Sequence, residues 1–210
     1  MVHDFKTEQE AFWAGEFGDK SISRNSEKEL LAAKISLWSK ILQKGKTIEN
    51  CLEFGPNIGM NLKALGILFP YIDMYGVEIN KNAAEECGKL ERTTVYNESI
   101  LEFSSEKKFD LVFTCGVLIH INPDELVSVY DKMYQFSRKY IVICEYYNPS
   151  PVEIPYRGNK GKLFKRDFPG ELMDRFQNLK LVDYGFSYHR DNHFPMDDLT
   201  WFLLEKSDER

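Results

Sequence analysis

Short apolar runs alternate with helical patterns from residue 47 onward, and this alternation limits the possible folds more than any other feature of the chain. Polar turns separate five predicted strands, at residues 47–54, 73–79, 93–100, 108–117 and 140–147. Helical spacing of apolar residues predicts three helices between them, at residues 61–69, 81–91 and 123–137. Strand and helix in alternation imply right-handed crossovers, so a doubly wound α/β domain with a mostly parallel sheet is expected.

The flanking segments fit the same single domain of 210 residues. Residues 26–44 have apolar side chains at helical spacing, with Ser26 able to cap the helix and Gly45 able to end it. A loop rich in proline and glycine, a short helix and two closing strands are expected after the core, at residues 148–170, 171–177, 179–189 and 198–206. The helix at 123–137 has an explicit start signal in Asn122, Pro123 and Glu125, which together predict a capping box.

Composition narrows the partners. The formal net charge is −6, from 27 basic and 33 acidic residues, so the chain lacks the global basic field of a non-specific nucleic-acid binder. Four cysteines without a CxxC pair indicate small core residues in a reducing compartment, and no metal site is predicted. No stretch looks like a signal peptide or a membrane span, so the expected location is cytoplasmic.

The stretch CLEFGPNIGMN, residues 51–61, follows the first predicted strand. In doubly wound sheets the loop after the first strand turns sharply and lets a nucleotide approach its backbone, which suits Gly55 and Gly59. Asn57 stands where a dinucleotide fingerprint has its middle glycine. Asparagine is among the residues that best tolerate positive φ, so the turn is expected to survive this difference.

Two acids indicate which nucleotide such a turn binds. Glu53 ends the first strand, where the pyrophosphate of NAD or FAD would meet its negative charge, whereas it can pair with the cationic amino group of S-adenosylmethionine. Glu78 ends the next strand 23 residues after Gly55, near the roughly 20-residue spacing of a ribose-binding carboxylate. The end of the third predicted strand carries the residues expected beside the adenine, Glu98, Ser99 and Ile100. The alternative is an ordinary strand-to-helix turn, with Glu78 a solvated strand end.

The chain resembles the class I S-adenosylmethionine-dependent methyltransferases through LEFGPNIG, VEIN and FDLVFTCGVLIHI. More narrowly, it is similar to the pseudaminic-acid-biosynthesis-associated methylases through FWAGEFGDKSISRN, GVLIHINPDEL, EYYNPSPVEIPYRG, LFKRDFPGE and the C-terminal YGFSYHRD and DDLTWFLLEK. The resemblance implies a Rossmann-like seven-strand sheet with its last strand antiparallel and an N-terminal helical extension. It divides the domain into an N-terminal lid and helix, a cofactor-binding core, a substrate-side loop and a C-terminal closing part, at residues 1–45, 46–147, 148–170 and 171–210.

The resemblance also implies where S-adenosylmethionine binds. The glycine turn surrounds the methionine part and Glu78 holds the ribose, while the residues after the fourth strand complete the site. The predicted cofactor-binding residues are Glu53, Phe54, Gly55, Pro56, Asn57, Gly59, Glu78, Ile79, Glu98, Ser99, Ile100, Cys115, Gly116 and Val117.

Other residues are expected on the substrate side. His120 follows the fourth predicted strand and Tyr147 ends the fifth, so both are candidate catalytic residues. The alternative for His120, a residue that shapes the pocket through backbone hydrogen bonds, stays open. A basic loop suggests an anionic substrate, unless its charges are simply solvated. N-terminal aromatic residues fit either a lid or packing at the sheet edge. The predicted substrate-binding residues are Trp13, Phe17, Arg24, Tyr146, Tyr156, Arg157, His189 and Arg190.

The function expected from these patterns is transfer of a methyl group from S-adenosylmethionine to N or O of a small anionic or amino sugar, such as a nonulosonic (pseudaminic) acid precursor. Two alternatives stay open. One is a methyltransferase of the same fold acting on nucleic acid or protein, and the other is a non-catalytic module that only binds the cofactor.

Overall fold

One seven-stranded sheet forms the centre of the molecule, in the order β3-β2-β1-β4-β5-β9-β8. The computed structural model describes residues 5–24 and 28–207, without the side chains of residues 23, 24, 28 and 29. Strands β1 to β5 pair in parallel, and β9 is antiparallel to both of its neighbours, β5 and β8. The predicted doubly wound α/β sheet with its last strand antiparallel is therefore confirmed.

The strands of this sheet are short and follow the predicted order. Their bounds are β1 (Asn50–Phe54), β2 (Asp73–Val77), β3 (Thr93–Tyr96), β4 (Phe109–Cys115), β5 (Ser137–Glu145), β8 (Leu179–Phe186) and β9 (Thr200–Lys206). The helices are α1 (Glu8–Ala14), α2 (Glu16–Arg24), α3 (Lys28–Leu42), α4 (Met60–Leu68), α5 (Lys81–Cys87), α6 (Leu126–Phe136) and α7 (Phe168–Arg175).

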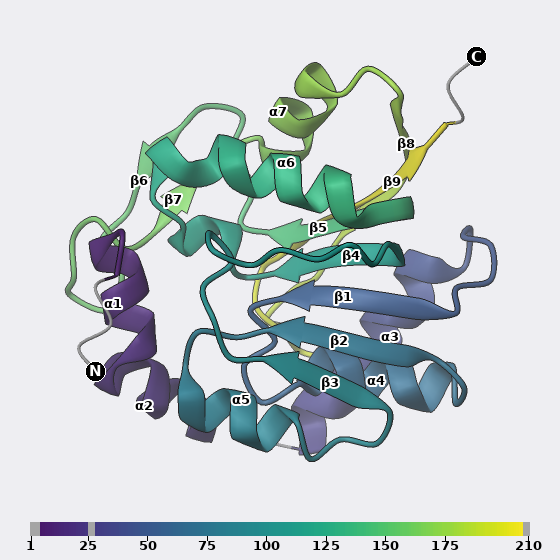
Figure 1. The fold of residues 1–210 in the computed structure, drawn as a ribbon, viewed down its shortest axis with the longest axis horizontal. Helices are drawn as coiled ribbons and strands as arrows, with labels where there is room; N and C mark the ends of the chain where they lie inside the picture. The colour runs from purple at the N-terminus through teal and green to yellow at the C-terminus, as the bar shows by residue number, and fades with distance from the viewer. Residues whose placement is uncertain (1–4, 25–27, 208–210) are drawn as a thin grey trace.

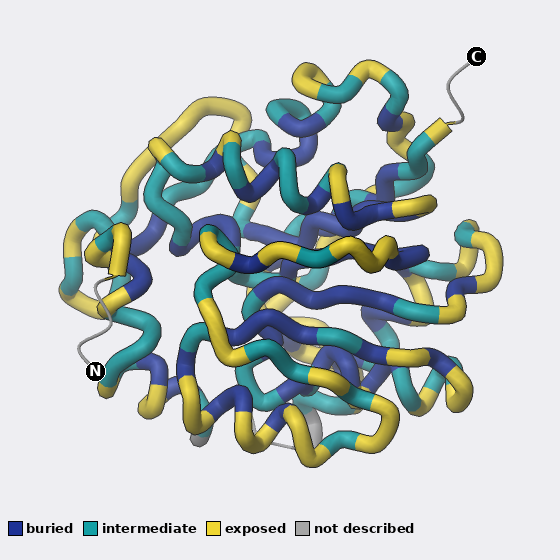
Figure 2. Tube along the Cα trace, in the orientation of Figure 1, coloured by how far each residue is buried: buried dark blue, intermediate teal, exposed yellow. Residues whose placement is uncertain are grey.

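Helices cover both faces of the sheet because alternate strand residues point to opposite sides. Cys51, Phe113 and Val142 pack with residues of α3 and α4 on one face. Leu52 and Val112 pack with residues of α6 and α7 on the other. Figure 2 shows the resulting pattern, with buried central strands and exposed outer helix surfaces.

The carboxyl ends of the parallel strands meet at one edge of the sheet. In Figure 1 the arrowheads of β1, β2, β4 and β5 point toward the side where α1 and α2 lie. A second, two-stranded sheet of β6 (Val152–Glu153) and β7 (Phe164–Lys165) lies on the same side. The chain between β5 and α7 therefore returns to the edge where doubly wound folds bind their ligands.

The structure corrects several predicted bounds. The loop expected over 148–170 contains β6 and β7, and α7 begins at Phe168. The predicted capping box is only half present: the Asn122 side chain accepts from the Asp124 N–H at 3.0 Å, but the carboxylate of Glu125 accepts from Lys6 Nζ at 2.7 Å. The Glu125 side chain pairs with Lys6, which is distant in the sequence, and so does not form the capping bond that its spacing from Asn122 predicted. Ser26, the predicted cap of α3, lies outside the described residues.

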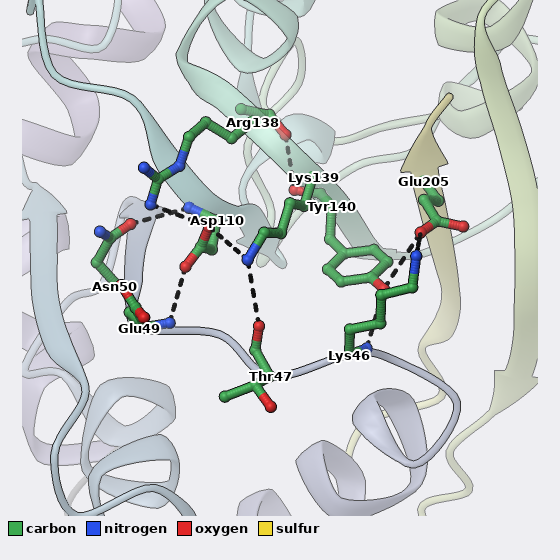
Figure 3. A network of polar contacts seen from close by, with 10 residues as sticks. Lys46, Thr47, Glu49, Asn50, Asp110, Arg138, Lys139, Tyr140 and Glu205 are labelled. Carbon is green, nitrogen blue, oxygen red and sulfur yellow. Dashed lines mark hydrogen bonds and ion pairs between the residues drawn. The ribbon is translucent and has the colours of Figure 1, made fainter. Parts of the chain in front are cut away.

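A polar network fastens the opposite, amino edge of the sheet (Figure 3). The Asp110 carboxylate, 1% exposed, accepts from the Glu49 N–H at 2.8 Å and pairs with Arg138 and Lys139 at 3.0 and 3.1 Å. Burial raises the pKa of Asp110, but the amide bond and the two cations outweigh burial and hold the pKa below its usual value. This network links the start of β4 to the start of β5.

Two further observations bear on the sequence predictions. None of the helices in the described part of the chain has the length and apolar character needed to cross a membrane. All four cysteines are free thiols, and all except Cys115 are buried.

Candidate functional site

A cavity of about 610 Å³ opens at the carboxyl edge of the sheet. Its walls come from the turn after β1, the ends of β2 and β4, and residues of α1, α2 and α3. The cavity spans the point between β1 and β4 where the strand order reverses, and its volume falls within the roughly 300–1,000 Å³ of small-molecule sites.

The turn after β1 has the backbone that the sequence predicted. Gly55 has φ of 69°, and a Cβ there would lie 2.7 Å from a methyl carbon of Val117, so both conformation and space require glycine. The expected positive φ of Asn57 is confirmed at 52°. Its side chain donates to Ser21 Oγ of α2 at 2.6 Å, so the N-terminal segment is fastened directly onto the turn.

Glu78 braces the same turn from the end of β2. One carboxylate oxygen accepts from the Asn57 N–H at 2.8 Å and the other from the Asn80 N–H at 2.8 Å. Burial raises the pKa of Glu78, and these amides only partly oppose the rise. Each oxygen has a second lone pair, so the carboxylate can hold the backbone and still accept from a ligand hydroxyl.

Glu53 lies beneath the cavity and has no exposed surface. Its Oε1 accepts from Asn61 Nδ2 at 2.6 Å, and Asn61 accepts in turn from the Trp38 indole at 3.2 Å. The other oxygen, Oε2, has no hydrogen-bond partner among the described residues. Burial raises the pKa of Glu53 to about 8, against the lowering effect of Asn61. Asn61 lines the cavity, so Glu53 acts on it through this amide.

Lys34 of α3 brings a cation into the cavity. The residue is only 9% exposed, and its Nζ lies 3.2 Å from Cys115 Sγ. Among the described residues no carboxylate lies within ion-pair distance of this ammonium. Burial lowers the pKa of Lys34, but nearby Cys115, Cys144 and Glu53 raise it by more than burial lowers it. The pKa therefore ends above its usual value, and the ammonium stays charged. A buried ammonium with spare donors is suited to an anionic group of a ligand.

The sulfur that faces Lys34 is itself polarised. A hydrogen bond from Cys144 lowers the pKa of Cys115 to about 6, burial opposes the change, and the Lys34 cation adds to it. The two cysteines are register partners on neighbouring strands β4 and β5. Lys34 thus pairs with a soft sulfur acceptor, and its ammonium has further N–H donors for a carboxylate of a ligand.

Glu145 fixes the turn that follows β4. Its Oε1 accepts from the Val117 and Leu118 N–H groups at 3.0 and 3.1 Å. Burial raises the pKa of Glu145 to about 7, although the two amides oppose it. The same turn carries His120, whose Nδ1 lies 2.6 Å from the Lys162 carbonyl oxygen. A carbonyl only accepts, so Nδ1 carries the proton and Nε2 keeps its lone pair.

Burial lowers the pKa of His120 to about 4, although the bond to the Lys162 carbonyl opposes the shift. The imidazole is therefore neutral near pH 7. Its ring centroid lies 4.6 Å from that of Trp13 and 4.8 Å from that of Tyr156. These three rings line the cavity together, so α1 and the 148–170 loop meet over His120.

Solved structures share this architecture, whereas no family model and no curated protein matches the sequence. The plantazolicin methyltransferase BpumL in complex with SAH is 15% identical, with TM-score 0.65 over 95% of this chain and 94% of that one. The N-methyltransferase NodS from Bradyrhizobium japonicum, also with SAH, is 14% identical, with TM-score 0.67 over 90% and 98%. Magnesium protoporphyrin IX methyltransferase from Synechocystis is 12% identical, with TM-score 0.69 over 94% and 97%.

The strand order and these matches agree. The chain has the class I methyltransferase fold. In this fold the crevice between β1 and β4 is the expected ligand site, and the cavity described above lies there.

Most of the predicted site residues line this cavity of the class I methyltransferase fold. On the cofactor side they are Gly55, Pro56, Asn57, Glu78, Ile79, Ser99, Ile100, Cys115, Gly116 and Val117. On the substrate side they are Trp13, His120, Tyr146, Tyr156, Arg157 and His189. The structure brings these residues together, and their roles stay predictions.

Several predicted residues lie outside the cavity lining. Tyr147, two residues after the end of β5, is 40% exposed and packs on Phe202. Phe54 is buried in the core beneath α6, and Gly59 starts α4 against Cys87. The remaining residues outside the lining are Glu53, Phe17, Glu98 and Arg190, of which the last two are exposed. Arg24 ends α2, and its side chain lies outside the described part.

Three residues of the cavity wall were not predicted from the sequence: Lys34, Asn61 and Glu10. Lys34 interrupts the apolar stripe of a predicted helix, and a charge at a core-facing position is the signal that identifies it. Asn61 lies two residues after Gly59, in the first turn of α4. Within residues 5–24 and 28–207 no group of three His, Cys, Asp or Glu side chains is placed to hold a metal ion.

Proposed function

We propose that the protein is an S-adenosylmethionine-dependent methyltransferase acting on a small molecule. The observation that carries the proposal is the charged Lys34, buried in the cavity without a carboxylate partner among the described residues. It lies beside the glycine turn, while Glu78 lies at the end of the adjacent strand. A nucleoside joined to an amino acid matches this set of groups, because it offers ribose hydroxyls to Glu78 and a carboxylate to Lys34.

The residues divide the cofactor between them. Lys34 pairs with the methionine carboxylate, and Asn61, oriented by Glu53, lies beside the amino group. Glu78 accepts from the ribose, and the segment Ser99–Leu101 borders the base. When bound, the cofactor supplies an electrophilic methyl group on a sulfonium sulfur.

His120 orients the methyl acceptor through its Nε2. The Lys162 carbonyl fixes the tautomer, and a neutral imidazole with a pKa of about 4 is a good hydrogen-bond acceptor but a weak base. This combination favours an amine that arrives neutral over a hydroxyl that must lose a proton. The acceptor atom is therefore nitrogen rather than oxygen.

The acceptor is a small anionic or amino sugar, such as a nonulosonic acid precursor. Arg157 supports this choice, because a two-residue turn closed by Tyr156 and Asn159 holds it at the cavity rim with φ of 49°. Strain at a non-glycine residue is typical of functional positions. Arginine suits bidentate contact with a carboxylate or phosphate. The 148–170 loop is thus the substrate side of the domain.

Residues of the N-terminal part act as a lid over the cavity. The Glu8 carboxylate pairs with Lys162 at 3.2 Å, and Gln9 donates to the Gly161 carbonyl at 2.9 Å. At the other end Asp19 accepts from Asn80 at 3.0 Å. The lid spans from the substrate-side loop to the α5 side, so it excludes water from both halves of the cavity.

Glu78→Ala tests the cofactor assignment. Affinity for S-adenosylhomocysteine should fall because the ribose contact is lost, and the melting temperature should fall as well, because the Asn57 and Asn80 N–H groups lose their acceptor. Unchanged affinity in calorimetry would remove Glu78 from the ribose role.

Turnover is tested by incubating the protein with S-adenosylmethionine and a set of amino sugars and sugar acids. The expected product carries one added methyl group by mass spectrometry, with one equivalent of S-adenosylhomocysteine. Cofactor binding without any product across sugars, nucleic acids and peptides would favour the non-catalytic module instead.

A further inference from the structure

Helix α1 contributes a buried carboxylate to the cavity. Glu10 is 9% exposed and lines the cavity wall. Its Oε2 accepts from the Thr7 N–H at 2.8 Å and from Thr7 Oγ1 at 3.0 Å, so the start of α1 holds the side chain in place. Carboxylates are seldom this buried without a partner that requires them.

The partner of the other oxygen lies after β3. Ser99 Oγ donates to Glu10 Oε1 and accepts from the Leu101 N–H at 3.0 Å. Ser99, Ile100 and Leu101 line the cavity next to Glu10. With one hydrogen bond from Ser99, Oε1 keeps a second lone pair for a donor in the cavity.

Glu98, the acid expected beside the adenine, does not take this position. It is exposed and lies outside the cavity lining, because the chain leaves β3 at Tyr96 with the Ser99 side chain turned inward. The described acid at the base end of the cavity therefore comes from α1, almost ninety residues earlier in the sequence.

We propose that Glu10 recognises the exocyclic amine of the cofactor's adenine base. The inference rests on the proposed function, and it makes the nucleobase end of the site dependent on the lid. An amine donates to a carboxylate oxygen, whereas a 6-oxo purine presents a carbonyl that the same oxygen repels. Thr7 and Ser99 position the acceptor, so the lid distinguishes adenine from hypoxanthine only when α1 is docked.

The test compares S-adenosylhomocysteine with S-inosylhomocysteine, in which oxygen replaces the 6-amino group, by calorimetry on the full chain. The wild type should bind the adenosyl ligand about tenfold or more tightly than the inosyl ligand. Glu10→Gln should narrow this preference to within about twofold, because the amide can donate to the inosyl carbonyl. Glutamine also keeps the capping box, so α1 is expected to persist.

Two control variants are compared with Glu10→Gln in the same assay. Glu16→Gln removes an exposed acid of the lid, whose carboxylate pairs only weakly with Lys20 at 3.7 Å, and should keep the wild-type preference. Glu98→Gln removes the acid that the sequence favoured. If Glu98→Gln narrows the preference and Glu10→Gln does not, the inference is overturned.

Each remaining outcome of this experiment also tests the role of Glu10 in recognising the base. Equal weakening of both ligands by Glu10→Gln would assign Glu10 to lid docking and overturn its recognition role. Adenosyl binding with an unchanged preference in Glu10→Gln would overturn the inference and leave the proposed function standing. If the wild type binds neither ligand, the proposed function fails, and the inference fails with it.

Discussion

Glu53→Gln tests whether the buried acid beneath the cavity is protonated in the cofactor-free protein. Burial raises the pKa of Glu53 to about 8, whereas an unfolded chain gives a glutamate pKa of about 4.3. Between these values the folded protein keeps a proton that the unfolded chain has released. The contribution of Glu53 to stability is therefore fully present below about pH 4.3 and is lost as pH rises toward 8.

The magnitude follows from the two pKa values. Each pH unit in this window changes the free energy of unfolding by about 1.4 kcal/mol, so the contribution falls by about 2.5 kcal/mol between pH 5.5 and 7.5. Glutamine resembles the protonated acid and can keep the Asn61 bond, but it does not titrate. The stability of Glu53→Gln relative to wild type should rise by this amount over the same interval.

Urea unfolding of both proteins without cofactor, at pH 5.5 and 7.5, measures the difference. Other titrating groups cancel in the comparison where they do not contact residue 53. Glu91→Gln, at an exposed position, serves as the control and should give parallel curves. Parallel curves for Glu53→Gln itself would mean that Glu53 is already ionised, with Lys34 as its counter-ion, and would refute the reasoning.

Three further substitutions separate the roles of charged residues. Lys34→Met should lower affinity for S-adenosylhomocysteine about ten- to hundredfold in calorimetry, because a charge-assisted bond to the ligand is lost. Lys40→Met, at an exposed position on the same helix, should leave this affinity unchanged. Equal affinities of Lys34→Met and wild type would remove Lys34 from the site. Arg157→Ala should reduce methyl-acceptor use in a turnover assay and leave cofactor affinity nearly unchanged, and a loss of cofactor affinity would contradict the division of the cavity. Asp110→Asn should lower the free energy of unfolding by about 3 kcal/mol at pH 7, and this penalty should shrink as pH falls below about 4, where the wild-type carboxyl also becomes neutral. Asp131→Asn, which breaks an exposed pair, should cost less than about 1 kcal/mol in the same urea assay.

The fold was predictable because its signals are local and repeated. Each strand of the parallel core is a short apolar run, and each crossover helix has apolar residues at regular spacing, so neither needs a distant contact to be recognised. The same holds for the glycine turn, where Asn57 adopts the positive φ expected from its side chain.

The parts of the site that escaped prediction depend on distant partners. Glu10 and Glu98 are two acids that could lie beside the adenine base. Only the contact of α1 with Ser99 decides that Glu10 faces the cavity. Lys34 lies on a helix that packs on the sheet, so its approach to Cys115 follows from helix rotation rather than from any motif. Glu125 left its expected capping box for the same reason, since Lys6 of the N-terminal segment reaches it.

The most direct test of the whole account is calorimetric titration of the purified protein with S-adenosylmethionine and S-adenosylhomocysteine, with NAD as the control. Saturable binding of both sulfur ligands at one site, without NAD binding, is the expected result. NAD binding, or no binding of either sulfur ligand, would contradict the assignment of the Lys34 and Glu78 cavity as a cofactor site.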